Sequence, residues 1–477
     1  MMWKIKTTTM LAGALLLSAC AVGPDYHRPA TDVPAAYKEA GNWKPASPDD
    51  AGNRGSWWSV YNDPVLDGLE NQVAVSNQNL KASEAAYRQA DAIVQETRAS
   101  LFPSATLDAG AQRSGGGTQP PSNKFSTSLG ASWEPDLWGR IARTVEGDVA
   151  SAQASAADLA SATLSAQGTL AADYFELRAT DQLRRLLDAT TDDFAKALKI
   201  TKNQYAAGIV TKGDVLQAQT QLDSTRAQAI NVGVQRAQLE HAIAVLIGKP
   251  PASFTLKPAG DLPAAPAVPP TLPSVLLEHR PDIAAAERRM AASNAEIGVA
   301  ISAFFPDITL NASDGFTSAA LGALLRTSSS VWAVGPQLAL TVFDTGARAA
   351  KVREARAAYG QQVALYRQTV LTAFQQVEDD LASLRILAQQ AGVQGQAVKS
   401  ARQAETLVLN QYKAGTVAYT SVITAQNAVL SNEQTALNIR ENRLAASVQL
   451  IEALGGGCPA SKTFPALPNA NAGGAHQ

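Results

Sequence analysis

Cysteines and aromatic residues are scarce in this chain of 477 residues, and neither charge sign is in marked excess. Aromatic side chains make up 6% of it, and 40 basic residues stand against 42 acidic ones. This balance gives no sign of the basic surface that binds nucleic acid, so no nucleic-acid partner is expected. Alanine, glutamine, serine and leucine dominate many segments. The composition favours long helices packed through small side chains over a compact aromatic core.

A long apolar run is also missing after the first 19 residues, which predicts that no helix crosses a membrane. The N-terminus has Lys4 and Lys6, then the apolar segment 10–17, then Ser and Ala before Cys20. This order predicts a lipoprotein signal peptide over 1–19, after which Cys20 carries the lipid. The alternative is an ordinary signal peptide that ends near a cysteine by chance. Because lipid occupies the Cys20 sulfur, only Cys458 remains as a possible thiol after cleavage, so no internal disulfide can form.

Groups of catalytic or metal-binding residues are missing too. The four histidines, at 27, 241, 279 and 476, lie far apart in the sequence, and Met290 is the one methionine expected after processing. Residues 456–463 partly mimic a phosphate-binding loop, but Ser461 stands where the second glycine belongs. We therefore expect no enzyme activity, no metal and no cofactor, apart from diacylglycerol and palmitate on Cys20. Energy for any transport must come from a partner.

The most informative feature is a stretch that occurs twice, at 203–222 and at 410–429. Tyr205 corresponds to Tyr412 and Gly208 to Gly415, and each pair is 207 positions apart (412 − 205). Each copy follows one long helical pattern and precedes another. We therefore expect two helical hairpins with these stretches as their tips. Gly208 and Gly415 are expected to end the preceding helices in the left-handed conformation.

The domain organisation follows from this duplication. A unit of helix, two strands, long helix, tip and long helix is used twice. The predicted segments are the signal peptide 1–19, an extended segment 20–62, repeat 1 over 63–249, a proline-rich connector 250–273, repeat 2 over 274–455 and a flexible tail 456–477. Strands are expected at about 104–135 and 307–343, and tips at about 203–214 and 410–421. The connector carries eight prolines in 24 residues, which excludes a regular helix.

Two periodicities set the element types. No proline interrupts the helical pattern from 140 to 205 or from about 346 to 412, and each run is about 100 Å long at a rise of about 1.5 Å per residue. Residues 105–112 and 124–133 alternate apolar and polar side chains, which is typical of a strand with one wet face. A third strand begins at Ile308, and a fourth has its apolar face from Trp332 to Val342. The Gly- and Pro-rich residues 114–123 predict a loop.

Four strands are too few to close a barrel. Single-chain outer-membrane barrels begin at about 8 strands, and an open sheet edge in lipid leaves backbone groups unpaired. The strands must therefore close with other subunits. Three copies would give roughly 12 strands with room for a lumen, and the long amphipathic helices would project from one end as a tube.

Several motifs occur together in this chain. They are the lipobox before Cys20, CAVGPDYHRP from position 20, WEPDLWGR at 133–140, FDTGAR at 343–348 and the two Y-x-x-G tips. In this combination the chain resembles the outer membrane efflux protein family of the TolC/OprM type, and most of all its NodT-like lipoproteins. The resemblance covers essentially the whole mature chain.

The resemblance implies a fold, a location and partners. The fold is mainly α with a transmembrane β part: a homotrimer in which four β-strands per chain complete a 12-stranded outer-membrane β-barrel, and long hairpins form a periplasmic α-barrel. The location is the outer membrane, held by lipid and barrel. The partners are a periplasmic adaptor (membrane fusion) protein and an inner-membrane pump of the resistance-nodulation-division (RND) type. The implied function is efflux of small molecules such as drugs or toxic compounds.

The resemblance also implies a gate at the tips. In the family, residues after the Y-x-x-G turns form inter-helix hydrogen bonds that hold the periplasmic end shut, and rings of carboxylates narrow it. Carried over by position, Asp214 and Tyr412 are the main candidates, and a bond between them would be charge-assisted. Val417 stands where the family's closure can use an arginine, and Ser421 and Thr424 stand where some members have acids. We therefore expect an asymmetric gate.

Plainer interpretations exist for these residues and for the chain. Asp214 in the first turn of the returning helix favours the helix dipole without any gate, and Tyr205, the remaining candidate, can simply pack the turn. The chain could instead be the outer-membrane conduit of a type I secretion system, although the lipobox and GPDYHRP favour a pump. It could also be a structural coiled-coil lipoprotein, but the alternating strands and the long duplication speak against that.

Overall fold

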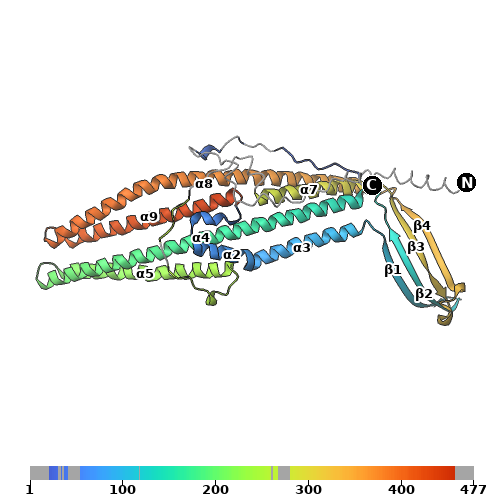
Figure 1. Ribbon diagram of the computed structural model, residues 1–477, viewed down its shortest axis with the longest axis horizontal. Helices are drawn as coiled ribbons and strands as arrows, with labels where there is room; N and C mark the ends of the chain where they lie inside the picture. The colour runs from blue at the N-terminus through green and yellow to red at the C-terminus, as the bar shows by residue number, and fades with distance from the viewer. Residues whose placement is uncertain are drawn as a thin grey trace.

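The computed structural model describes residues 21–30, 34, 37–40, 54–117, 119–258, 261–266 and 280–456. The helices form an elongated bundle with a sheet of strands at one end, and the two hairpin tips lie at the other end (Figure 1). The signal peptide, Cys20 and Cys458 lie outside the described residues, as do parts of the predicted connector and all but the first residue of the predicted tail.

The bundle consists of two sets of helices with matching lengths. The first set is α3 (Gln78–Ala99), α4 (Arg140–Ala206) and α5 (Lys212–Leu246), and the second is α7 (Pro281–Ser302), α8 (Ala347–Lys413) and α9 (Tyr419–Ala453). The corresponding helices have 22, 67 and 35 residues in both sets. A helix of that greatest length spans about 100 Å. The predicted duplication and its two long hairpins are therefore confirmed.

Side-chain caps define where the first helices begin. Asp63 precedes α2 (Pro64–Ser76) and accepts hydrogen bonds from the next backbone N–H groups at 2.9 and 3.2 Å. Pro64 occupies the first helical position, where no N–H is needed. Asn77 separates α2 from α3 and caps the latter in the same way, at 2.9 and 3.2 Å. The break between the two helices follows from this second cap.

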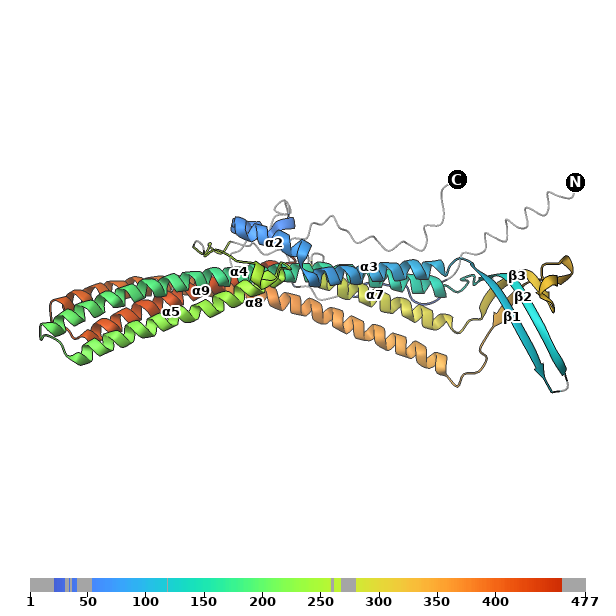
Figure 2. The ribbon, with the colours of Figure 1, turned by 90° about the horizontal axis from the view of Figure 1, so that it is seen from below.

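The core runs along one buried seam on each of the two long helices. The α4 seam contributes Leu170, Tyr174 and Leu177, and the α8 seam contributes Val370, Val377 and Leu381, all of them buried. Both views show the α4/α5 and α8/α9 hairpins running side by side (Figures 1 and 2). Within the described parts of the chain, no helix is long and apolar enough to span a membrane.

Short helical turns complete the helical part. They are η1 (Lys38–Ala40), η3 (Arg54–Tyr61), η4 (Pro251–Ser253), η5 (Leu321–Ala323) and η6 (Thr327–Ser329). The turn η3 corrects the expectation of an irregular segment up to residue 62. Trp57, Trp58 and Tyr61 are buried in it against α4 and α9, because three aromatic rings within five residues need apolar cover.

The four strands form one antiparallel sheet in the order β1-β2-β3-β4. They are β1 (Ser104–Gly116), β2 (Gln119–Trp133), β3 (Asp307–Ser318) and β4 (Ser330–Ala339). The register places Ala105, Ala131, Ala312 and Val334 in one row. Directly paired residues share a face, so the apolar positions predicted on each strand meet on one side of the sheet. Asp314 is an acid in that face, beside Leu129 and Trp332.

The ends of the strands correct the sequence-based boundaries. Residues 114–116 and 119–123, expected in a loop, continue β1 and β2, so the turn of this hairpin is short. Backbone pairing along the two strands outweighs the local preference of their glycines and prolines: Ser114 pairs with Ser122 and Gly116 with Gln119, all four expected in the loop. The fourth strand ends at Ala339, so Leu340 and Val342 lie beyond it.

The described N-terminal segment packs along the helices through hydrogen bonds and an ion pair. Val22 donates a backbone hydrogen bond to Trp138 at 3.1 Å, and Asp25 pairs with Arg143 of α4 at 2.8 Å. Further on, the Glu378 carboxylate of α8 accepts the backbone N–H groups of Lys38 and Glu39 at 2.7 and 2.8 Å. The segment that follows Cys20 is thereby tied to both repeats.

Candidate functional site

The two tips share one backbone turn. Gly208 has φ of 75° and Gly415 has φ of 76°, the left-handed conformation expected for these positions. Gly208 donates to the Tyr205 carbonyl at 2.9 Å, and Gly415 donates to the Tyr412 carbonyl at 3.0 Å. Without a Cβ, glycine adopts this conformation at little cost. The Y-x-x-G spacing therefore encodes a reversal of direction, whatever else the tips do.

The first tip closes on itself through a capping box. Thr211 precedes α5, and its hydroxyl accepts a hydrogen bond from the Asp214 backbone N–H at 3.2 Å. The Asp214 carboxylate in turn accepts from the Thr211 N–H and hydroxyl, both at 2.8 Å. The carboxylate also lies at the positive end of the helix dipole. The structure thus gives Asp214 the capping role that was the plainer interpretation.

The second tip is organised by buried tyrosines. Tyr412 and Tyr419 are 2% and 1% exposed, and their ring centroids are 5.4 Å apart. The Tyr412 hydroxyl lies 3.0 Å from the hydroxyl of Thr201 on α4. Together with Phe194, Leu222 and other apolar side chains, these rings form a core cluster that joins the two hairpins. We call the Thr201 and Tyr412 contact the tip hydroxyl pair.

Within the described chain, Asp214 and Tyr412 form hydrogen bonds with other residues and not with each other. Asp214 is held by Thr211, and Tyr412 by Thr201. The two predicted partners still lie near each other. Burial raises the pKa of Tyr412, the hydrogen bond with Thr201 lowers it, and the Asp214 charge raises it further. A gating role for either residue stays a prediction.

The other candidates have local roles in the described chain. Thr424 is exposed, and its hydroxyl donates to the carbonyl of Thr420 at 2.9 Å. Ser421 is partly buried in the first turn of α9, where its N–H donates to the Ala418 carbonyl at 3.0 Å. Tyr205 is 47% exposed, so it does not pack the first tip as Tyr412 packs the second. The tips are therefore asymmetric, as predicted from their sequences.

Sequence reasoning missed Thr201. A threonine inside a long helix is often bonded to its own backbone, and the Thr201 hydroxyl does donate to the Ala197 carbonyl at 3.0 Å. Its position in line with the buried Phe194 and Ala197 was the available signal, since it places a polar group on the apolar seam of α4. No spacing rule linked that seam to Tyr412, 211 positions away.

A second constellation lies where strands become long helices. In WEPDLWGR, Arg140 pairs with both carboxylate oxygens of Glu134 at 2.7 Å, and Asp136 accepts the first backbone N–H groups of α4 at 3.1 and 2.7 Å. Trp138 stacks on Phe305 with centroids 4.8 Å apart, and its indole donates to the Pro306 carbonyl at 2.8 Å. The motif thus fixes the direction of α4 against the second repeat.

FDTGAR makes the equivalent connection in the second repeat. Asp344 accepts hydrogen bonds from the Gly346 and Arg348 backbone N–H groups at 3.0 and 3.1 Å. Arg348 pairs with the same carboxylate at 2.6 Å, and these bonds lower the pKa of Asp344 to about 2. Gly139 and Gly346 precede α4 and α8 with φ of 75° and 89°. Both motifs therefore fix the starts of the two long helices.

Comparison with known proteins gives consistent matches over this architecture. The family described as outer membrane efflux protein matches residues 69–249 and 272–456. The toluene efflux pump outer membrane protein TtgF of Pseudomonas putida is 30% identical over 463 residues, covering 94% of this chain and 96% of the relative. The pyoverdine export outer membrane protein OpmQ of Pseudomonas aeruginosa is 31% identical over 467 residues, covering 95% and 97%. The solved outer-membrane channel OprN superposes with a TM-score of 0.85 at 28% identity, covering 92% of this chain and 99% of that chain.

Proposed function

This chain belongs to the outer membrane efflux protein family, and we propose that three copies of it enclose one continuous duct. It is an outer-membrane efflux channel with a periplasmic helical part, the component that gives an RND-type pump its exit. That role points to a transporter rather than an enzyme. It also requires a periplasmic adaptor and an inner-membrane pump to supply substrate and energy.

One observation carries the proposal of a trimer. The described sheet has only four strands, and β1 and β4 each pair on one side alone. An unpaired edge in hydrocarbon leaves backbone N–H and C=O groups without partners, at several kcal/mol each. Joining β4 of one copy to β1 of the next removes every edge. Three copies then give about 12 strands, enough for a lumen.

Cysteine pairing along the two edges tests this closure. Single cysteines placed along β1 and β4, in a background with Cys20 retained for lipid attachment and Cys458 replaced by serine, should cross-link between copies in outer membranes. The expected product is a closed species of three chains, and its register should be antiparallel. Cross-links within one chain only, or monomers throughout, would exclude the assembly. A pair of cysteines across β2 and β3 of one chain is the matched control for labelling.

The tips are proposed as the gate of this duct. The tip hydroxyl pair ties α4 to α8 inside an apolar cluster, and Tyr419 packs beside it. The Asp214 charge acts on Tyr412, while Ser421 and Thr424 supply only neutral hydroxyls. We infer that closure at this end depends more on buried packing than on a carboxylate ring. A basic partner at Val417 is absent by sequence, which supports the same inference.

Two further features are proposed from the sequence. Cys20 is the lipid-bearing residue, with diacylglycerol and palmitate as the attached groups, and it adds to the anchoring by the barrel. Labelled palmitate should enter the native protein and not Cys20→Ser. The cargo is proposed to be small molecules such as drugs or toxic compounds, because relatives are named for export of toluene, antibiotics and pyoverdine. Gene deletion followed by susceptibility testing with solvents and antibiotics checks this class.

A further inference from the structure

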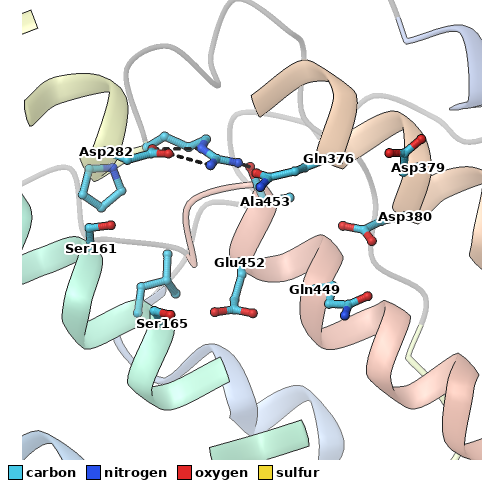
Figure 3. A pocket seen from close by; sticks show the side chains of 12 residues that line it. Ser161, Ser165, Asp282, Gln376, Asp379, Asp380, Gln449, Glu452 and Ala453 are labelled. Carbon is cyan, nitrogen blue, oxygen red and sulfur yellow. Dashed lines mark hydrogen bonds and ion pairs between the residues drawn. The ribbon is translucent and has the colours of Figure 1, made fainter. Parts of the chain in front are cut away.

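A cavity lined with acids lies where α7 begins and α9 ends. Its volume is about 450 Å³. Figure 3 shows Ser161 and Ser165 on one side, Asp379 and Asp380 on another, and Glu452 between them. The walls come from α4, α7, α8 and α9, so both repeats meet here. We call this the acidic cavity.

The one cation in the wall of the acidic cavity is already engaged. Arg280 forms two bonds with Asp282, at 3.0 and 2.7 Å, and donates to the Ala453 carbonyl at 3.0 Å. The guanidinium therefore serves Asp282 and the end of α9 (Figure 3). In the described residues, Glu452 and Asp380 form no ion pair with it, and α4 presents only serines and Leu164 to the cavity.

A further acid, Glu70 of α2, interacts with Glu452 of the cavity wall. Glu70 has no exposed surface, and both of its carboxylate oxygens lack a hydrogen-bond partner in the described residues. Its electrostatic neighbour is Glu452. Gly168 of α4 makes room for the Glu452 carboxylate, because a Cβ at that position would lie 2.0 Å from the carboxyl carbon. The two glutamates thus lie in the contact between α9, α4 and α2.

We propose that Glu70, Glu452 and Asp380 form a proton-binding junction that controls how firmly the α8/α9 hairpin packs on α2 and α4. Protonated, the three carboxyls are neutral and the helices pack closely. Ionised, they place like charges in a partly dry contact without a free cation, and they force the contact to loosen. The groups that face them are Asp379 on α8 and both Asp282 and Arg280 at the start of α7.

The protonation behaviour agrees with this geometry. Burial, with the Glu452 charge adding to it, raises the pKa of Glu70 to about 9. Burial and then Asp380 raise the pKa of Glu452 to about 7, against the lowering effect of Arg280. Burial and then Asp379 raise the pKa of Asp380 to about 7, again opposed by Arg280.

The sign of the resulting pH dependence follows from linkage. Each carboxyl holds its proton in the folded protein at a pH where the unfolded chain has released it. The stabilisation is complete below the ordinary range of about 4 and is lost as pH rises through about 7 and toward about 9. Protons rather than metal ions are the inferred ligand, since no described group of three or more His, Cys, Asp or Glu residues is arranged to hold a metal.

Thermal unfolding of the full-length protein in detergent, scanned at fixed rate between pH 5.5 and 9, tests the proposal. The native protein should lose apparent melting temperature as pH rises. Glu452→Gln and Glu70→Gln imitate the protonated state, so each should flatten this slope and raise the midpoint at pH 8.5 by about 2 °C or more. Asp380→Asn should do the same and serves as the readout if a glutamate variant fails to fold.

The matched control is Glu354→Gln on the same helix α8, whose exposed carboxylate pairs with Lys351. It should keep the native slope. Native-like slopes in all three cavity variants would overturn the proposal. The proposal would also be overturned if 5 mM magnesium or calcium raised the melting temperature of the native protein at pH 8.5 but not that of Glu452→Gln. The cavity would then bind a cation.

Discussion

The hydroxyl of Tyr412 on α8 donates to the hydroxyl of Thr201 on α4 at 3.0 Å, and both residues are buried. The direction follows from Thr201, whose own proton is used for the Ala197 carbonyl at 3.0 Å. The tip hydroxyl pair therefore has one required donor, Tyr412, and one acceptor that already has another bond. Because of this asymmetry, removing the Thr201 hydroxyl and removing the Tyr412 hydroxyl should have different effects.

Thr201→Val is expected to loosen the tip more than Tyr412→Phe. The valine leaves the Tyr412 hydroxyl buried without an acceptor, at a cost of about 1–3 kcal/mol. The phenylalanine leaves Thr201 bonded to Ala197, so it should cost only about 0.5–1.5 kcal/mol. Single-channel recordings in planar bilayers should show more frequent or larger openings for Thr201→Val. The double variant should behave like Tyr412→Phe, and two silent single variants would show that the pair does not restrain the tip.

Two substitutions at Asp214 distinguish the effect of its negative charge from the effect of its hydrogen bonds at the start of α5. Asp214→Ala removes both and should cost about 0.5–1.5 kcal/mol, because the Thr211 N–H loses its side-chain acceptor while Thr211 itself still caps α5. Asp214→Asn keeps a side-chain oxygen for the Thr211 N–H and removes only the charge. If capping is the role, the alanine variant frays α5 while the asparagine variant keeps native conductance. Equal increases in conductance for both variants would instead assign the charge itself to the gate.

Much of the helical framework was predictable because its signals are local. The uninterrupted helical patterns, each ended by a tip glycine, predicted the ends of the 67-residue helices within about one residue. The tip glycines were predictable for the same reason, since the left-handed conformation depends on the residue that adopts it.

Contacts between distant segments were not predictable in this way. Thr201 meets Tyr412 across 211 positions, and Trp138 meets Pro306 across 168. No periodicity reports such pairs, because they depend on how the repeats pack. The loop prediction at 114–123 was wrong for a related reason: pairing between the two strands decided the backbone of Ser114 and Ser122, against the glycine and proline signals around them.

The glycines before the two long helices offer a matched comparison. Gly139 and Gly346 both have positive φ, so alanine at either position costs roughly 1–2 kcal/mol of backbone strain. A Cβ added at Gly346 would meet no atom within 4 Å, whereas a Cβ added at Gly139 would lie 2.6 Å from the Ala21 Cα. Gly139→Ala should therefore be the more damaging change and should also displace the N-terminal segment. Melting temperature and protease cleavage near residue 25 measure the two effects, and equal behaviour of both variants would contradict this difference.

Gly168 and Gly147 test how tightly the Glu452 carboxylate is held. Both glycines lie inside α4, where alanine normally gains about 0.5–1 kcal/mol over glycine. A Cβ at Gly147 meets its nearest atoms at 3.6 Å, an ordinary contact, so Gly147→Ala should be neutral or stabilising. A Cβ at Gly168 would overlap the carboxyl group of Glu452.

Gly168→Ala should therefore be less stable than Gly147→Ala, by about 1–3 kcal/mol, which is the usual cost of overpacking. The obstacle is the end of a flexible side chain rather than backbone, so the glutamate should swing toward the cavity instead of forcing α4 and α9 apart. Removing that side chain should then rescue the protein. In thermal or denaturant unfolding, the double variant Gly168→Ala with Glu452→Ala should be more stable than the sum of the two single changes predicts. Strict additivity would mean that the carboxylate does not occupy the space beside Gly168.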